Sequence, residues 1–254
     1  AVRVLIGPPY QAIAARYADA FPPAYRSAYG PAEAATDIGR MRGLAADEAD
    51  LAPRRGARLH RLECDPAGVL RLKLYQRFGT LTLSDAVPVL ENFGFAAIED
   101  TSTELDGGRA GTLHDFELAP PKGCDPAALL ARAGEIEEAV SAVLNGAAEN
   151  DAFNRLITAS ALSSRETGWL RAWYRYLRQS GMSFGIPTAV DALQNAPEVT
   201  RGVLDLFAAL HDPAFAGDRA RAETEAAGAI HDGLAKVKAI NDDRLLRQYR
   251  ALVD

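Results

Sequence analysis

Residues 70–94 read LRLKLYQRFGTLTLSDAVPVLENFG, and the spacing of their apolar residues changes halfway along the stretch. Leucine occupies every second position from Leu70 to Leu74, with basic residues between, which predicts a strand with one buried face. From Ala86 to Phe93 the apolar residues recur at i, i+3, i+4 and i+7, which predicts an amphipathic helix. The glycine that follows can end this helix in the left-handed conformation. The stretch is therefore expected to form a strand that leads into a helix.

The start of this helix depends on the residue that caps it. If Asp85 is the N-cap, Pro88 occupies the third helical position, where no backbone N–H is needed. If Ser84 is the N-cap, the proline removes one helical hydrogen bond. Both alternatives leave a short loop between the strand and the helix.

Strand signals lie on both sides of residues 70–94. A weaker strand around Leu59 precedes them across an Asp-Pro-Ala-Gly turn. Two further strands are expected at 95–105 and 112–118. They are joined through an Asp-Gly-Gly sequence, which is a strong hairpin signal.

The strand at 112–118 has two different faces. Its even positions from His114 to Leu118 hold the histidine and two apolar residues, whereas Asp115 and Glu117 share the other face. His114 is therefore expected to be a hydrogen-bonded histidine in a core or an interface.

An amphipathic helix is expected after this hairpin, with Asp125 as its N-cap, Pro126 at its first position and Gly146 at its end. The resulting order is strand, helix, strand, strand, helix. That order predicts a ferredoxin-like α/β plait, and the weak strand near Leu59 can supply the missing edge.

Helical segments flank this α/β part. Residues 10–20 can form a short helix, and a second can begin near Pro31. From Glu149 onward only helical patterns occur, including a capping box from Ser163 to Glu166. We therefore expect an α+β chain with three segments: a helical lead-in at 1–56, a ferredoxin-like α/β domain at 57–147 and an all-α helical bundle at 148–254.

The composition is that of a globular protein with a negative charge. The chain has 254 residues, 48% hydrophobic residues and a net charge of −6, which argues against binding to nucleic acid or to an anionic membrane. No apolar run approaches a membrane span, and the first residues do not have the pattern of a signal peptide. Two cysteines, Cys64 and Cys124, indicate a reducing compartment. A cytoplasmic location is expected.

Two long stretches resemble a known family. The first is residues 70–94, and the second runs from 150–156 (NDAFNRL) to 173–181 (WYRYLRQSG). In residue identity and in order along the chain, they resemble the non-catalytic part of the large-subunit bacterial NAD-dependent glutamate dehydrogenases. The resemblance runs from about Pro22 to the C-terminus. The resemblance implies that the α/β domain at 57–147 is ACT-like, in agreement with the predicted plait. It also implies a piece of a much longer enzyme, as does the missing initiator methionine.

The resemblance also implies a function. The parent enzyme would convert L-glutamate, NAD and water to 2-oxoglutarate, ammonium and NADH, and this segment would serve in scaffolding, oligomerisation or regulation. Its expected partners are the catalytic domain of the same chain, further copies in a homo-oligomer and an amino-acid effector. The alternative is a free-standing, amino-acid-sensing ACT-type regulatory protein. The reading frame beyond Asp254 would separate the two.

No catalytic, cofactor-binding or metal-binding residue is predicted in this segment. No Gly-x-Gly-x-x-Gly follows a strand, and Gly107 to Gly111 have the wrong spacing and lie in a hairpin. The lysine–glycine pair at Lys122 favours a plain turn. His60 and Cys64 would lie about 13 Å apart on a strand, too far to bind one ion. NAD is therefore expected only in the rest of the parent enzyme.

One helix carries arginines interleaved with aromatic residues, a combination common in interfaces. The residues of the predicted interface are Trp169, Arg171, Arg175, Tyr176 and Arg178. A solvated or intrachain face is the plainer alternative, and an anion site is a further one. A nucleic-acid-binding helix is a weaker interpretation because the chain is acidic.

A small-molecule site is the remaining possibility. In ACT domains that bind amino acids, the loop between the first strand and the first helix is commonly used, and a helix N-terminus can receive a carboxylate. The matching residues here are Gly79, Thr80 and Asp85. Glycine in a tight strand–helix loop is also expected without any ligand.

Overall fold

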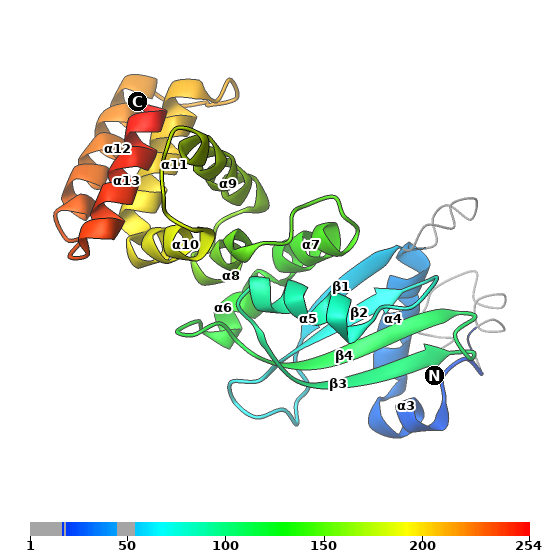
Figure 1. Ribbon diagram of the computed structural model, residues 1–254. Coiled ribbons are helices and arrows are strands. Elements are labelled where there is room, and N and C mark those ends of the chain that lie inside the picture. Colours follow the sequence, from blue (N-terminus) through cyan, green and yellow to red (C-terminus); the bar gives the residue numbers. More distant parts are fainter. Residues whose placement is uncertain (1–16, 18, 45–53) are drawn as a thin grey trace. The chain divides into compact units, whose positions relative to one another are not determined.

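The strand and helix expected within residues 70–94 are present in the computed structural model, as β2 (Leu70–Gln76) and α5 (Leu83–Asn92). The next strands are β3 (Ala96–Leu105) and β4 (Gly111–Ala119), which form the predicted hairpin. β4 pairs antiparallel with both β2 and β3 and therefore lies between them (Figure 1). This is the split β-α-β arrangement of the ferredoxin-like plait, which confirms the predicted fold.

The fourth strand is β1 (Arg55–His60), which pairs antiparallel with β2. The order across the sheet is β1-β2-β4-β3. The weak strand predicted before residue 70 therefore supplies the missing edge, although it precedes the rest of the plait in the chain.

The structure describes residues 17, 19–44 and 54–254. The chain divides into two compact units, unit 1 ending at Asn150 and unit 2 beginning at Asp151. The short helix expected at 10–20 falls almost wholly outside the described residues. The division into three segments, with boundaries after residues 56 and 147, stays a prediction.

The outer edge of β1 is covered by α7 (Ala133–Leu144) and the residue after it. Asn145 Oδ1 accepts a hydrogen bond from the Arg55 N–H, and Glu137 Oε1 accepts one from the Leu59 N–H, each at 2.9 Å. Eight helical residues rise about 12 Å and four strand residues about 13 Å, so the two spacings match. Helix side chains thus satisfy edge groups that would otherwise be open to pairing with another strand.

The start of α5 differs from both predicted alternatives. Its N-cap is Thr82, whose side chain makes no capping hydrogen bond, so neither Ser84 nor Asp85 is the cap. Pro88 lies inside the helix, where its missing N–H removes one hydrogen bond. Gly94 has a φ of +84°, the left-handed conformation predicted for it.

The helix expected after the hairpin is divided in two. α6 (Pro126–Ala131) is separated from α7 by Arg132, whose backbone is not helical. Asp125 caps α6 by accepting a hydrogen bond from the Ala127 N–H at 3.2 Å, as predicted. Gly146 follows α7 with a φ of +71°.

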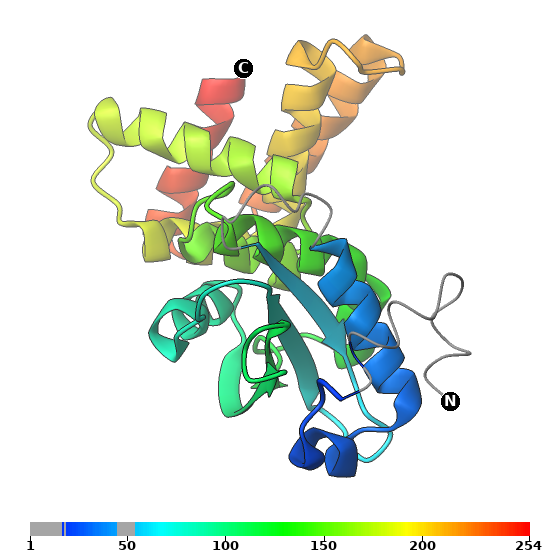
Figure 2. The same ribbon diagram turned by 90° about the vertical axis from the view of Figure 1, so that its right-hand side faces the viewer.

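The second face of the sheet is buried too, beneath α3 (Pro23–Ala28) and α4 (Pro31–Gly43). Figure 2 shows α4 and α5 on opposite faces of the sheet. Lys73 is only 1% exposed and Asp115 only 5%. The prediction of a single buried face is therefore wrong, because the charged residues on this face are paired inside the protein. Beside them lies an apolar core made of Tyr17, Ala20, Phe21, Tyr25, Ala34, Ile38, Met41, Tyr75, Leu105, Ala110 and Leu113.

Unit 2 is all-helical, as predicted for the C-terminal part. Its elements are η1 (Ala152–Asn154), α8 (Arg155–Ala159), α9 (Ser164–Gln179), α10 (Ile186–Asn195), α11 (Pro197–His211), α12 (Arg219–Leu234) and α13 (Ile240–Val253). Ser163 and Glu166 form the predicted capping box at the start of α9. One apolar core, with Phe153, Leu245 and Tyr249 fully buried, joins these helices.

Candidate functional site

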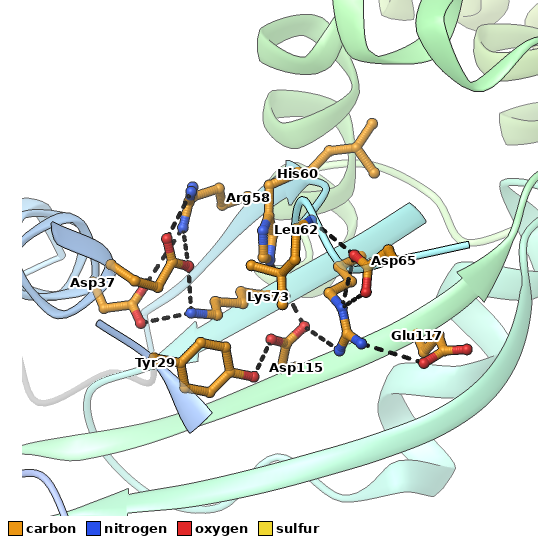
Figure 3. Close-up of polar contacts among 12 residues, drawn as sticks. Tyr29, Asp37, Arg58, His60, Leu62, Asp65, Lys73, Asp115 and Glu117 are labelled. Atoms are coloured by element: carbon orange, nitrogen blue, oxygen red, sulfur yellow. Dashed lines mark hydrogen bonds and ion pairs between the residues drawn. The ribbon is translucent and has the colours of Figure 1, made fainter. Parts of the chain in front are cut away.

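A buried lysine lies at the centre of a charged network between α4 and the sheet (Figure 3). Lys73 projects from β2, and its Nζ lies 2.6 Å from Glu33 Oε1 and 2.7 Å from Asp37 Oδ2. The ammonium also lies 4.2 Å from the ring centre of Tyr29, a cation–π distance. A buried ammonium is stable only with such partners, so α4 and β2 depend on each other here.

Arg58 of β1 supplies a second positive charge. Its guanidinium binds Glu33 through both nitrogens, at 2.5 and 3.2 Å. Burial alone would raise the pKa of Glu33, but hydrogen bonds from Arg58 and Lys73 lower it to about 2. Glu33 is therefore a carboxylate at neutral pH, bound by two cations.

Two tyrosine hydroxyls complete the surroundings of Asp37, which is fully buried. Tyr25 and Tyr75 donate hydrogen bonds to its two oxygens at 2.5 and 2.7 Å. Burial and the negative charge of Asp37 raise the pKa of both tyrosines far above the ordinary value. Both hydroxyls therefore stay protonated and act as donors.

The network continues to Asp115 of β4. Tyr29, next to the end of α3, donates a hydrogen bond to Asp115 Oδ2 at 2.5 Å. On the other side, His60 Nε2 lies 3.7 Å from Asp115 Oδ1, and Arg71 Nη1 lies 4.0 Å from the same atom. Burial would raise the pKa of Asp115, but His60 and Tyr29 hold it below the usual value. Asp115 thus links α3 to strands β1, β2 and β4.

Arg71 of β2 connects the network to the loop that follows β1. Its Nε lies 2.8 Å from Asp65 Oδ1, and its Nη2 lies 3.3 Å from Glu117. Asp65 in turn accepts a hydrogen bond from the Leu62 N–H at 2.7 Å. The loop between β1 and β2 is therefore tied to the same charged face of the sheet.

The arrangement is suited to holding helices on a sheet. Its cations and carboxylates are bound to one another, which satisfies charges that would be costly to bury alone. Sequence reasoning missed this network, although two signals were present. Lys73 stands in the middle of a strand, and Asp37 stands between Ala34 and Met41 on the apolar stripe of a helix.

Of the three residues of the predicted effector site, Gly79 and Thr80 lie in the loop from β2 to α5 and Asp85 lies in the first turn of α5. Gly79 has a φ of +72°, so this position favours glycine for its backbone conformation. Thr80 and Asp85 are exposed. The effector site stays a prediction.

Arg171 is buried and has intrachain partners. It is 9% exposed, its Nε lies 2.8 Å from Asp151, and its Nη2 lies 2.7 Å from Asn154. It links the start of unit 2 to α9, as in the alternative of an intrachain face, and its part in an interface stays a prediction.

The other members of the predicted interface lie closer to solvent. Tyr176 is 58% exposed, and Arg175 and Arg178 are exposed as well. Trp169 is partly buried, with its ring centre 4.8 Å from that of Phe207 in α11. Their role as an interface stays a prediction.

The two histidines of unit 1 have different environments. His114 pairs with Asp100 at 3.1 Å and stacks on Phe116, as expected of a core histidine. His60 is buried on the opposite face beside Asp115, whereas Cys64 is exposed. Among the described residues, no group of three or more histidine, cysteine or acidic side chains is arranged to hold a metal ion. In the same part of the chain, no helix is long and apolar enough to cross a membrane.

Three family models match consecutive parts of the chain. Residues 10–44 match helical motif 2 of glutamate dehydrogenase, residues 55–131 match its ACT3 domain, and residues 148–213 match its helical motif 3. Thus α3 and α4 fall in helical motif 2, and the sheet falls in the ACT3 domain. The charged network joins these two parts.

Similar full-length proteins agree with this assignment. The NAD-specific glutamate dehydrogenase of Halomonas elongata is 34% identical over 239 residues, which cover 94% of this chain and 14% of that protein. The enzyme of Mycobacterium tuberculosis is 30% identical over 96% of this chain and 15% of its own length. That of Pseudomonas aeruginosa is 33% identical over 72% and 12%. The chain spans about one seventh of the length of the first two relatives. It belongs to the NAD-specific glutamate dehydrogenase family, over the ACT3 domain and helical motifs 2 and 3.

Proposed function

We propose that this chain is a scaffolding and regulatory segment of a large cytoplasmic NAD-dependent glutamate dehydrogenase and contributes no catalytic residue. The parent reaction would be the oxidation of L-glutamate with NAD and water to 2-oxoglutarate, ammonium and NADH. The observation that carries the proposal is the buried contact of Lys73 with Glu33 and Asp37. It joins helical motif 2 to the ACT3 domain by charges that are largely shielded from solvent.

A buried ionic contact of this kind favours one relative position of its two parts. If the helices slid along the sheet, Lys73 and Asp37 would be buried without partners, which costs several kcal/mol. An apolar contact tolerates such shifts better, because it has no direction. The network therefore suits a segment that keeps its helices in a fixed position on the sheet within a larger assembly.

The proposal can be tested in the full-length enzyme with Lys73→Met and, as a matched control, Lys122→Met at an exposed position of the same unit. We expect Lys73→Met to weaken oligomer assembly, measured by sedimentation velocity, without changing the KM for NAD. The control should behave as wild type. Normal assembly of a Lys73→Met enzyme would contradict the scaffolding role.

The claim that this segment lacks catalytic residues has its own test. Calorimetric titration of the 254-residue chain with NADH is expected to give no binding heat. Stoichiometric binding with a micromolar Kd would overturn the claim, because the chain would then hold a cofactor site.

A second candidate function is amino-acid sensing at Gly79, Thr80 and Asp85, within the large enzyme or in a free-standing regulatory protein. The observation in its favour is the N-terminus of α5, where Thr82 makes no side-chain cap and first-turn N–H groups can meet a carboxylate. Amino acids at millimolar concentration should then shift the amide resonances of these three residues. Unchanged resonances would leave the α/β domain without this role.

A further inference from the structure

Two buried atoms in the charged network face each other without a hydrogen-bond partner. They are His60 Nε2 and Asp115 Oδ1, and they lie 3.7 Å apart. The side chains are 7% and 5% exposed. Buried polar atoms are normally paired, so this gap is a place where a small change in charge has a large effect.

Charged and titratable groups from several elements surround His60. The charged and titratable groups are Arg58 on its own strand, Asp65 in the following loop, Arg71 and Lys73 on β2, Asp115 and Glu117 on β4, Tyr29 next to α3, and Glu33 and Asp37 on α4. Together these groups include five carboxylates and three cationic side chains, one of which is Lys73, directly across the sheet from Asp115. A proton on His60 would reduce this excess of negative charge.

The pair is connected directly to the helices. Asp115 uses its second oxygen to accept the hydrogen bond from Tyr29, the residue that follows α3 (Figure 3). Since His60 and Tyr29 hold the pKa of Asp115 below its usual value, this group stays a carboxylate at neutral pH. Histidine is the side chain that ordinarily titrates in this range, near pH 6.5.

We propose that His60 is a proton-operated latch, which tightens the docking of α3 and α4 on the sheet when protonated and loosens it when neutral. The inference rests on the proposed role of the network as the attachment of helical motif 2. Imidazolium Nε2 donates to Asp115 Oδ1 and adds an ionic attraction. Neutral imidazole retains at most a hydrogen bond between uncharged and charged partners, which is weaker.

The test is hydrogen exchange of the 254-residue chain at pH 6 and pH 8, expressed as protection factors so that intrinsic exchange cancels. We expect protection of residues 23–43 to fall about tenfold between the two pH values, because a hydrogen bond between two charged partners is roughly twice as strong as one with a neutral partner. Residues 83–92, in α5 on the other face, should change little. Constant protection of residues 23–43 in the wild-type chain would overturn the proposal.

Variants assign the effect to one residue. Unit 1 contains two of the four histidines, His60 and His114, which are buried to the same degree on opposite faces. His60→Gln should remove the pH dependence, and His114→Gln should retain it. Asp115→Asn gives the same answer as His60→Gln if the latter does not fold. Persistence of the pH dependence in either His60→Gln or Asp115→Asn would overturn the latch. The hydrogen-exchange experiment measures how the docking of α3 and α4 within this chain depends on pH. Its outcome therefore does not depend on the assembly test with Lys73→Met.

Discussion

Different forces stabilise the interior of each of the two units. In unit 1, α4 lies on the sheet through charged groups, with Lys73 bound to Glu33 and Asp37 at 2.6 and 2.7 Å. In unit 2, α11 and α12 approach closely through glycines, with Gly202 facing Ile230 and apolar side chains around them. Ionic contacts depend on charge and pH, whereas apolar packing depends on volume. The two units should therefore respond to different perturbations.

The largest difference is expected when a buried charge is removed. Lys73→Met removes the ammonium that Glu33 and Asp37 share and leaves only Arg58 beside them, which should destabilise unit 1 by about 3–5 kcal/mol. Both tryptophans lie in unit 2, so their fluorescence during urea unfolding reports that unit alone, while circular dichroism reports both. The tryptophan transition should be unchanged. Lys122→Met, at an exposed lysine, should stay within about 0.5 kcal/mol of wild type, and an equal loss in both variants would contradict the comparison.

The second largest difference between the two units is expected in their stability at acid pH. The pKa of Glu33 is lowered from 4.5 to about 2, so the folded state favours the charged form. Its contribution is complete above pH 4.5 and is lost as the pH falls towards 2, and it is on the order of 2 kcal/mol once solvent screening of this partly exposed carboxylate is included. Circular dichroism should show this acid-induced loss in the wild-type chain and a smaller loss in Glu33→Gln. The same loss in both proteins would mean that other carboxylates are responsible.

Volume should matter in unit 2. A Cβ at Gly202 would lie 2.7 Å from Ile230 Cγ1, so Gly202→Ala should destabilise the bundle by about 1–2 kcal/mol despite the better helix propensity of alanine. Gly228 of α12 has open space, so Gly228→Ala should stabilise it by up to about 1 kcal/mol. Tryptophan fluorescence measures both. If both substitutions changed the stability of unit 2 in the same direction, the close contact at Gly202 would not determine the effect of an added Cβ.

The smallest effect on stability is expected at the surface of α9. Tyr176 is 58% exposed, so Tyr176→Ser should change the stability of the chain by less than about 0.5 kcal/mol. If this surface is an interface, the same substitution should weaken assembly of the full-length enzyme several-fold in sedimentation velocity. Ile240→Ser, at a residue that is 84% exposed in the same unit, serves as the control. Equal assembly of the two variants would remove Tyr176 from the predicted interface.

Local patterns predicted most of the elements. The alternation of Leu70 to Leu74, the Asp-Gly-Gly hairpin and the capping box at Ser163 each depend on neighbours within a few residues. The structure contains all three. The start of α5 was missed by two or three residues, because Thr82 takes the N-cap position without a capping hydrogen bond.

Pairing between distant residues was not predictable in the same way. Lys73 meets Asp37 across 36 positions of the chain, and Arg171 meets Asp151 across 20. A basic residue in an alternating strand, or on a helix stripe, has the same local pattern whether it meets water or a carboxylate. Both residues were therefore placed on solvent-facing or contact surfaces, and both are buried.

The amino-acid sequence by itself determined the family, the plait and the helical bundle, since these follow from long similar stretches and from periodicity. Only the tertiary structure decided that the second face of the sheet is covered and that its charges form one network from Asp37 to Asp115. The physical reason is that periodicity reports which side of an element is apolar. It does not report which distant element brings a matching charge, and burial of a charge depends on that partner.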